Sequence, residues 1–560
     1  MSGSMIEREP VGRVIDNSAY DSFTFVVEEG KHVQFGNYYV VRHPSKEVDV
    51  LTRIIGLNYR NPEMDVSRYG PRYAKKGLTL PASDQEILLA TAEPLGYFDG
   101  DKFRPLEVPP PTWTPVYEAS EGDLQRFIAP SGKGYYLGVG RIRNTDVPFS
   151  LDINGLVKGH CFICGMTRSG KSTFLLSLAE IARKELDPPL HLMIFDRRGE
   201  YGPLAEKLKA KQLPYTSFLK PFSKMDPRDV MRMLGIGKGK LQEYVTSGVE
   251  KMQSEGAEPT VKNLETYVFG EIESKATGAY VSRYIATAKD SIRRYGSGIE
   301  KLPRTSKDPV AVMGDHDLSL VDFSVDTNIS RQQIVASDIV SALLRESMSN
   351  DDFGGIVAIE EIQYFAPEEI MVKYGDNWRR SRDAIVEAVS QGGGYNLSFV
   401  IMTQRPAYVS KSVISQCNTV VSFRLMSWND QQAIINYSEY GSKALAKYLS
   451  GLADHEALVA GIALPCRFPV IVETRVEDYP RKATKDAKQT FEAMRRGGPE
   501  KAEAKAVEEA EKPKGSSKNP PSCFGKSWYQ LEECVKCDWA DRCKTAMDEA
   551  AEARKTSLSF

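Results

Sequence analysis

The segment Gly165–Ser172 reads GMTRSGKS and matches the full pattern of a phosphate-binding loop, G-x-x-x-x-G-K-[ST]. The run HCFIC predicts a strand before the loop, and TFLLSLAEIA predicts a helix after it. In such a loop, backbone N–H groups surround the phosphates, Lys171 reaches the β and γ phosphates, and the Ser172 hydroxyl can hold Mg²⁺. A chance match or an inactive loop is the alternative. We predict a site for ATP and Mg²⁺, with the binding residues Gly165, Thr167, Arg168, Ser169, Gly170, Lys171, Ser172 and Thr173.

Hydrolysis also needs carboxylates at the end of a second buried strand, and Glu360 and Glu361 directly follow the apolar run GGIVAI. Glu360 stands where an aspartate ordinarily contacts Mg²⁺ through water, and Glu361 stands where a general base would polarise the attacking water. Glutamate in the first position shifts the carboxylate by about one bond, which could reduce activity. In the alternative interpretation the two residues only cap the strand.

The apolar run LSFVIMT is followed by Gln404 and Arg405. A strand-end amide in this place lies beside the attacking water, so Gln404 is a candidate sensor of the γ-phosphate. An ordinary turn without that role is the alternative. The predicted catalytic residues are Lys171, Glu360, Glu361, Gln404 and Arg405.

Apolar runs that alternate with helical stretches predict the elements that position these residues. The runs at 159–164, 191–195, 355–359 and 398–402 are separated by helical patterns, which is typical of an α/β fold with a mainly parallel sheet. This core is expected to span about 116–480. A polar, helix-patterned stretch at about 202–310 is interpreted as an insertion into it.

The segment 11–115 has a different pattern. Short alternating runs separated by Gly, Pro, Asn and Asp turns predict a small β-barrel or sandwich. Pro109–Pro111 and Pro115 predict a stiff connection from this domain to the core. After the core, residues 481–520 are rich first in Lys, Glu and Ala and then in Pro, Ser and Lys, which indicates a charged helix and a flexible linker.

The last segment, 521–560, contains a C-x10-C-x2-C-x5-C pattern. Four thiols so close together in a short segment predict a metal site, because metal binding would supply folding energy that a small core cannot. Zinc and an iron–sulfur cluster both fit, and four reduced thiols without metal remain the alternative. The candidate ligands are Cys523, Cys534, Cys537 and Cys543. A second pair, Cys161 and Cys164, lies in the strand before the phosphate-binding loop and is expected to be buried core.

Composition narrows the class of protein. The 560 residues include 73 basic and 75 acidic side chains, for a net charge of -2. This length predicts two to four domains, and the balanced charge means that any nucleic-acid contact comes from local patches or a ring interior. There is no run of about 18 apolar residues and no apolar N-terminal segment, so we expect neither a membrane span nor a signal peptide. Eight cysteines in so long a chain favour a reducing compartment, and we expect the cytoplasm.

The ordered segments GMTRSGKS, FDRRGEY, IEEIQYFAPEE, TQRP, ISQCNTVVSFRL and HEALVAGIALPCRFPVIV resemble the HerA/FtsK class of ring-forming DNA translocases, and within it the HerA branch. The resemblance covers about 138–480. It implies a RecA-like ATPase core, a homohexameric ring with ATP sites between subunits, and double-stranded DNA in the pore. It also implies that 11–115 form the β-barrel shared with ATP-synthase-like rings, and that the partner is a NurA-type nuclease or a phage-defence effector. Asp196 and Glu200 of FDRRGEY would lie near the metal, unless they only cap a turn.

One departure from this family concerns an arginine. HerA relatives commonly show G-R-x-x-G before the TQRP strand, which offers an arginine to the neighbouring active site. This chain reads GGGYN at 392–396, with Gly393 in the arginine position. Hydrolysis still needs a positively charged side chain that contacts the γ-phosphate. The candidates are Arg405, Arg382, Arg141 and Arg143, any of which can equally be a solvated surface charge.

A translocase grips the phosphate backbone through Lys and Arg side chains without reading bases. The candidate clusters, each also interpretable as a solvated face, are Lys238 with Lys240, Arg293 with Arg294, and Arg379 with Arg380 and Arg382. The sequence therefore predicts an ATP-hydrolysing ring motor on duplex DNA that acts in end processing, repair or phage defence. Two alternatives stay open: a nucleotide-binding scaffold ring with weak ATPase activity, and a DNA-packaging or conjugation ATPase.

Overall fold

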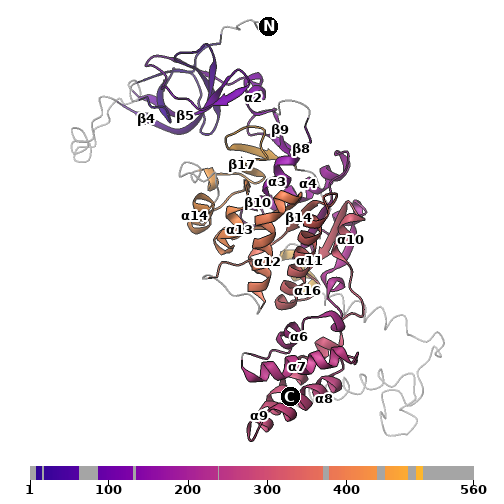
Figure 1. Ribbon diagram of the computed structural model, residues 1–560. Helices are drawn as coiled ribbons and strands as arrows, with labels where there is room; N and C mark the ends of the chain where they lie inside the picture. The colour runs from indigo at the N-terminus through magenta and orange to yellow at the C-terminus, as the bar shows by residue number, and fades with distance from the viewer. Residues whose placement is uncertain are drawn as a thin grey trace, which may run out of the picture. The chain divides into compact units, whose positions relative to one another are not determined.

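The computed structural model describes residues 8–15, 18–61, 86–129, 134–237, 239–369, 377–437, 448–476 and 487–495. The chain divides into two compact units, 1–482 and 483–560. Figure 1 labels the elements of both. In the second unit the described element is helix α16 (Ala487–Arg495). The predicted metal ligands Cys523, Cys534, Cys537 and Cys543 therefore lie outside the described residues.

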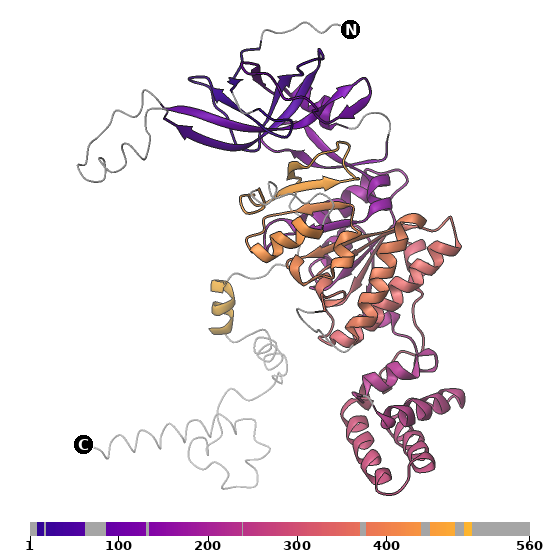
Figure 2. The ribbon, with the colours of Figure 1, turned by 60° about the vertical axis from the view of Figure 1, so that its left-hand side comes forward.

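The larger unit begins with a closed antiparallel barrel. Its strands follow the order β2-β1-β7-β3-β4-β5, pairing between β2 and β5 completes the circle, and the short β6 extends from β5. Alternate side chains of β2 point inward, as expected for short half-buried strands. Figure 2 shows these strands in indigo and violet. Their bounds are β1 (Gly12–Val14), β2 (Phe23–Val27), β3 (Tyr38–Arg42), β4 (Asp49–Arg60), β5 (Ile87–Asp99), β6 (Lys102–Arg104) and β7 (Pro115–Glu118).

The proline-rich segment expected to connect the barrel to the core differs from that expectation. Pro115 opens β7, which pairs with β1 and β3 and closes the barrel, so the barrel runs to Glu118 rather than 115. Proline is compatible with this place because the first residue of a strand can do without a ladder N–H. Helix α2 (Glu121–Ile128), with Ser120 as its N-cap in a capping box, follows the barrel.

The core is built on an eleven-stranded sheet in the order β12-β13-β11-β14-β15-β10-β16-β17-β18-β8-β9. The strands from β12 to β16 pair in parallel, and those from β16 to β9 pair antiparallel. This confirms the predicted α/β class. The bounds are β8 (Tyr136–Ile142), β9 (Pro148–Asp152), β10 (Cys161–Cys164), β11 (Leu192–Asp196), β12 (Lys211–Pro214), β13 (Leu318–Asp322), β14 (Gly355–Ile359), β15 (Leu397–Thr403), β16 (Thr419–Ser422), β17 (Glu456–Gly461) and β18 (Val470–Thr474).

The sheet separates two hydrophobic cores. The buried residues of α11 and α12 pack on one face, and those of α3, α4 and α5 pack on the other. In the described residues no helix has the length and apolar character needed to cross a membrane. The helices around the sheet are α3 (Ile153–Gly159), α4 (Lys171–Lys184), α5 (Gly202–Lys207), α10 (Pro309–Gly314), α11 (Ile329–Ser349), α12 (Trp378–Gln391), α13 (Lys411–Ser415) and α14 (Trp428–Tyr437).

The two cysteines of β10 point into opposite cores. Cys164 packs with α11 and α12, whereas Cys161 packs with α4. Burial raises the pKa of Cys164 to about 12 and raises the pKa of Cys161 well above its usual value. The expectation that this pair is buried core is confirmed.

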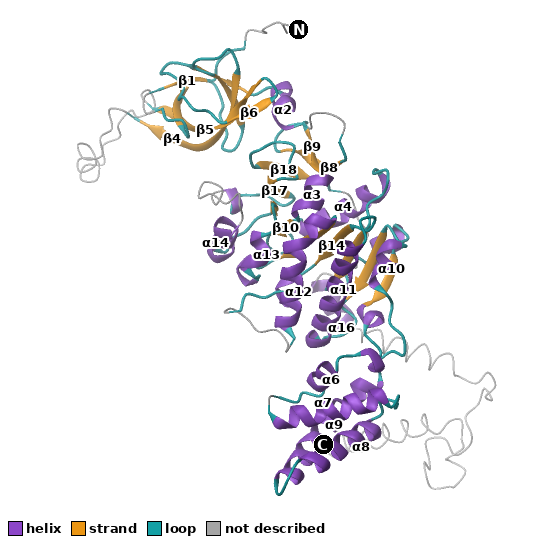
Figure 3. Ribbon diagram, in the orientation of Figure 1, coloured by secondary structure: helices purple, strands orange, loops and turns teal. Residues whose placement is uncertain are grey.

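Four helices between β12 and β13 form a separate all-helical group, visible in Figure 3. It lies within the range of about 202–310 predicted for the insertion, but that range begins too early, because β12 is a strand of the core sheet and α5 packs on that sheet. Apolar side chains of the group fill its interior, among them Val245, Leu264 and Ile292. The bounds are α6 (Pro227–Met233), α7 (Lys240–Ser254), α8 (Val261–Lys275) and α9 (Tyr280–Glu300).

Arg380 of α12 ties this helical group to the core. Its guanidinium pairs with Asp229 of α6, donates to Asp338 of α11 at 2.7 Å, and donates to the Ser337 hydroxyl at 3.1 Å. Asp229 is buried, and Lys220 also pairs with Asp338 at 3.1 Å. Arg380 is thus engaged in a structural ion network, which favours a structural role for this residue over a DNA contact.

Candidate active site

The phosphate-binding loop follows β10, which lies between β15 and β16. Gly165, Arg168 and Gly170 adopt left-handed φ values of 151°, 66° and 120°. A Cβ on Gly165 would lie 2.6 Å from the Cβ of Phe423, so only glycine fits there. Helix α4 begins at Lys171 and faces the loop with its N-terminal N–H groups. The sequence therefore folds here into a cradle for phosphate oxygens.

Lys171 is enclosed by this cradle. Its Nζ donates to the Met166 carbonyl of the loop at 2.8 Å. Burial lowers the pKa of Lys171 to about 8, opposed by the carboxylates of Glu361 and Glu360, and the nearby guanidinium of Arg198 lowers it further. A buried ammonium with so little compensation is stabilised when an anion binds beside it.

Glu360 follows β14 and meets the hydroxyl of Tyr201. The Tyr201 hydroxyl donates to Glu360 Oε1 at 3.4 Å, while Oε2 is buried and has no hydrogen-bond partner among the described residues. Burial raises the pKa of Glu360 well above its usual range, and the carboxylates of Asp196, Glu200 and Glu361 raise it further. The uncompensated negative charge calls for a cation.

These residues fit Mg²⁺. A hard divalent cation prefers oxygen ligands, and the Ser172 hydroxyl reaches the same place, where it hydrogen-bonds Tyr201. Within the described ranges there is no group of three or more His, Cys, Asp or Glu residues suited to holding a metal. That result agrees with a site of this kind, because Mg²⁺ beside a phosphate-binding loop takes most of its ligands from phosphates and water.

Glu361 lies at the centre of a hydrogen-bond chain that starts in the loop. Thr167 Oγ1 donates to Gln404 Oε1 at 2.6 Å, and Gln404 Nε2 donates to Glu361 Oε1 at 2.6 Å. Gln363 Nε2 donates to Glu361 Oε2 at 2.7 Å, and Thr403 donates to Gln363 at 2.8 Å. These hydrogen bonds hold the Glu361 carboxylate, at the end of β14, beside the phosphate-binding loop that follows β10.

The backbone at Glu361 is left-handed, with φ 50° and ψ 49°. This conformation costs on the order of 1 kcal/mol for a residue with a side chain, and such residues cluster at functional sites. Because both carboxylate oxygens are held by amide groups, the strained turn aims a single orientation of the side chain into the site.

Asp196 and Glu200 lie in the turn after β11. Asp196 accepts hydrogen bonds from the backbone N–H groups of Arg198, Gly199, Glu200 and Tyr201, at 2.7–3.2 Å. Its oxygens are therefore engaged in capping the turn. Glu200 pairs with Arg198 at 3.4 Å. Of the two interpretations offered by the sequence, the geometry of Asp196 favours the turn.

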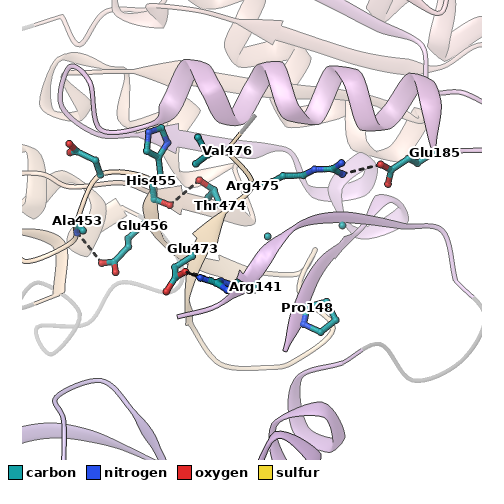
Figure 4. Close-up of a pocket in the computed structure, with 13 residues that line it drawn as sticks. Arg141, Pro148, Glu185, Ala453, His455, Glu456, Glu473, Thr474, Arg475 and Val476 are labelled. Carbon is teal, nitrogen blue, oxygen red and sulfur yellow. Dashed lines mark hydrogen bonds and ion pairs between the residues drawn. The ribbon is translucent and has the colours of Figure 1, made fainter. Parts of the chain in front are cut away.

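A pocket of about 740 Å³ is lined by residues of β8, β17 and β18, by His455 and by Glu185 at the C-terminal end of α4 (Figure 4). His455 connects the pocket to the phosphate-binding loop, because its N–H donates to the Ser169 carbonyl at 2.9 Å and its carbonyl accepts the Thr474 N–H at 2.8 Å. Arg475 pairs with Glu185 at the other end of α4 at 3.0 Å. The size of the pocket and its mixed lining suit a small organic group.

Two of the candidate arginines for the missing cation lie outside this network. Arg405 stacks over the Tyr408 ring, 4.3 Å from its centroid, and its Nε is 3.8 Å from Asp430. Arg382 pairs with Asp383 at 2.9 Å. Both are anchored by their own helices or turns rather than by the loop.

The other two candidates lie on and after β8. Arg141 pairs with Glu473 at 2.8 Å, whereas Arg143 donates to the Phe35 carbonyl of the barrel at 3.0 Å and lies 3.9 Å from Glu456. Arg141 lines the pocket described above. Arg143 instead links the barrel to the core.

The remaining candidate DNA contacts are placed only in part. Arg293 and Arg294 are exposed on α9, and Arg294 pairs with Asp290 at 3.0 Å. Lys240 is the first residue of α7, while Lys238 lies outside the described residues. The basic pair of α9 is thus on the surface of the helical group.

Sequence reasoning missed three participants in the site: Arg198, Tyr201 and Gln363. Arg198 Nη1 is 3.8 Å from Glu361 Oε1, and Tyr201 joins Ser172 to Glu360. Two of them stand in the FDRRGEY segment, whose position after β11 was the available signal. The sequence prediction named only the acidic residues of this segment, Asp196 and Glu200, although Arg198 and Tyr201 follow the same strand end.

Three features together define a P-loop ATPase: the phosphate-binding loop after β10, the paired carboxylates after β14, and the mainly parallel sheet in which β15 separates these two strands. Residues 137–346 match the family described as the central domain of helicase HerA. Over these residues the chain is similar to HerA helicases, and the comparisons support an ATPase of helicase type.

Several curated proteins are similar over most of the chain. The DNA double-strand break repair helicase HerA of Pyrococcus furiosus is 22% identical over 538 residues, covering 83% of this chain and 92% of that protein. The HerA helicase of Saccharolobus solfataricus is 25% identical over 393 residues, covering 66% and 73%. A probable helicase of Methanocaldococcus jannaschii is 22% identical, covering 84% and 91%.

Solved structures with partial likeness include VirB4 of Thermoanaerobacter pseudethanolicus, which is 14% identical, covers 62% of this chain and 98% of that chain, and gives a TM-score of 0.47. The plasmid coupling protein TrwB in complex with ADP and Mg²⁺ is 14% identical, covers 65% of this chain and 94% of that chain, and gives a TM-score of 0.43.

Proposed function

We propose that this protein is a ring motor that hydrolyses ATP to translocate on double-stranded DNA. The observation that carries the proposal is the chain of hydrogen bonds from Thr167 through Gln404 to Glu361, which joins the phosphate-binding loop to a candidate base. Similarity to HerA helicases over 83% of the chain supports the DNA substrate.

In this proposal the loop holds the phosphates of ATP, and the nucleoside occupies the pocket beside His455. Ser172 and Glu360 hold Mg²⁺, which would neutralise charge on the β and γ phosphates. Lys171 binds the γ-phosphate and regains its full charge. Glu361 accepts the proton of the attacking water, while Gln404 keeps its carboxylate in place.

The proposed assembly is a homohexamer with DNA in its pore, and the proposed compartment is the cytoplasm. With a net charge of -2, the chain would contact phosphates through local Lys and Arg side chains, of which Arg293 and Arg294 are candidates. The HerA relatives are named for double-strand break repair, so we propose a role in DNA end processing, repair or defence with a nuclease or effector partner.

The first test is ATP turnover with and without duplex DNA. We expect DNA to stimulate turnover, and we expect Lys171→Ala and Glu361→Gln each to lower kcat by on the order of 10²-fold or more. Glu387→Gln, an exposed carboxylate on α12, is the matched control and should turn over ATP normally. Robust turnover in the two site variants would overturn the assignment. A monomer in sedimentation with ATP and DNA present would overturn the ring.

A second candidate function is a nucleotide-binding scaffold ring. It is favoured by two residues, Glu360 in the place of the usual aspartate and Gly393 in the place of the arginine. The two functions predict different behaviour: a scaffold binds ATP tightly, and turnover stays at the background rate with or without DNA.

A further inference from the structure

Position 393 has no space for an arginine. A Cβ on Gly393 would lie 2.2 Å from the Lys158 carbonyl oxygen and 3.0 Å from its carbon. Both contacts are with backbone at the end of α3, which cannot rotate away as a side chain would. A cation for the γ-phosphate must therefore come from another part of the fold.

Arg198 lies at the mouth of the candidate active site. Its Nη1 is 3.8 Å from Glu361 Oε1, its Nε is 3.4 Å from Glu200 Oε1, and its side chain is 42% exposed. Such partly exposed ion pairs are weak, so the guanidinium can exchange these carboxylates for a stronger anion. The turn that carries Arg198 is fixed by the four backbone hydrogen bonds to Asp196.

The guanidinium of Arg198 lies beside a carboxylate that is linked to the phosphate-binding loop. Glu361 Oε1, its neighbour, also accepts the amide of Gln404, and that amide contacts Thr167 of the loop. The guanidinium and the loop thus meet at the carboxylate of Glu361.

We propose that Arg198 is a catalytic residue that acts in cis, binding the γ-phosphate of the ATP held by its own subunit. The proposal rests on the ATPase function proposed above. In the reaction, the water oxygen bonds to the γ-phosphorus, the bond from that phosphorus to the β,γ-bridging oxygen breaks, and its electron pair leaves with ADP. Glu361 takes a proton of the water. Arg198 keeps all its protons and stabilises the charge on the γ-phosphoryl oxygens.

Other arginines near the loop are less suitable. Arg424 is held by Asp454 at 2.7 Å and by the Leu452 carbonyl. Arg405, stacked on Tyr408, remains the alternative donor to a neighbouring subunit. The control variant for the experiments below is Arg345→Ala, which removes an exposed arginine of α11 that has no place in the candidate site.

The first experiment compares Arg198→Ala and Arg198→Lys in the full-length protein with the control Arg345→Ala, which should turn over ATP normally. We expect Arg198→Ala to lower kcat by on the order of 10²-fold or more with a change in ATP affinity of at most about tenfold, because the cation acts mainly on the transition state. Arg198→Lys keeps the charge and should recover part of kcat, and it also covers the case in which the alanine variant fails to fold. Unchanged kcat in folded Arg198→Ala overturns the proposal.

The second experiment separates cis from trans action. Lys171→Ala and Arg198→Ala chains carrying different tags are co-expressed, and mixed assemblies are purified through both tags. If Arg198 acts in cis, no subunit has both residues and the mixture stays inactive. If it acts in trans, a Lys171→Ala subunit supplies Arg198 to its neighbour, turnover returns, and the proposal is overturned. A wild-type chain without ATP turnover would instead refute the proposed function itself.

Discussion

Lys171 illustrates how burial sets up a residue for its ligand. The pKa of Lys171 is about 8, with burial the largest cause. Above about pH 8 the Lys171 amine is mostly neutral. Below that pH it is mostly a charged ammonium, which burial leaves poorly solvated. A phosphate beside it favours the charged form and raises the pKa again.

This shift leads to a prediction on pH. At about pH 9 ATP binding should take up a proton at Lys171, and at about pH 7 this uptake should vanish because the side chain is already charged. ATP affinity should accordingly fall as pH rises above about 8. Calorimetry in buffers of different ionisation enthalpy measures the proton number directly. Equal uptake at both pH values would contradict the assignment of this pKa.

Some residues of the candidate site can be predicted from the sequence and others cannot. Lys171, Ser172, Glu360 and Glu361 were found because their spacing and flanking apolar runs are local signals. Gln404 was placed correctly at a strand end, but its two partners come from segments far apart in the chain. Such contacts depend on strand order, which the sequence pattern does not encode.

At the scale of elements, the tight packing between α3 and the turn after α12 explains the glycine run. Gly393→Ala should lower the free energy of unfolding by about 1–3 kcal/mol, because its Cβ would meet the Lys158 carbonyl at 2.2 Å. Gly394→Ala is the matched control: no atom lies within 4 Å of its added Cβ, so we expect a change within about 0.5 kcal/mol. Denaturant titration of both variants decides, and equal stabilities would refute the packing argument.

The ion network of Arg380 is a second element-level feature. Arg380→Ala leaves Asp229 buried without its main partner, which should destabilise the attachment of α6 by about 2–4 kcal/mol. Arg379→Ala removes an exposed pair with Glu369 and an exposed cation–π contact with Trp378, and it should change stability by less than about 1 kcal/mol. Amide hydrogen exchange in α6 measures the effect, and similar protection in both variants would contradict it.

Elements were predicted from the sequence better than their contacts were. The periods of β10, β11, β14 and β15 are clear, and the structure places each within a residue or two of the expected run. The structural role of Arg380 could not be predicted, because its partner Asp229 is 151 positions away and no pattern connects them. The prolines near 110–115 signal a break in regular structure, but not that the next strand returns to the barrel.

At the scale of the molecule, the barrel and the ATPase core are joined by buried polar contacts. Arg53 of β4 donates to the Pro469 carbonyl at 2.6 Å, pairs with Glu93 at 2.8 Å, and lies 5.4 Å from the Tyr448 ring centroid. Because Arg53 is 2% exposed, these contacts hold the barrel against the strands that end at the pocket. The two parts of this unit are mechanically linked.

The balanced charge of the chain leads to a prediction at the same scale. If duplex DNA is gripped through its phosphates, stimulation of ATP turnover should fall steeply with salt, by about tenfold or more between 50 and 200 mM. Turnover without DNA should change little over that range, which serves as the control. Measuring both rates across a salt series tests the idea, and DNA stimulation that is insensitive to salt would rule out a phosphate grip.

The helical group α6–α9 enters the fold between β12 and β13, which are parallel neighbours at one edge of the sheet. Neither strand carries a residue of the candidate active site. In evolutionary terms, this crossover can gain, lose or exchange its helices while the hydrolytic centre stays intact, provided that a counterpart of the Arg380 contact persists. Variation in partner choice among relatives is expected to concentrate there.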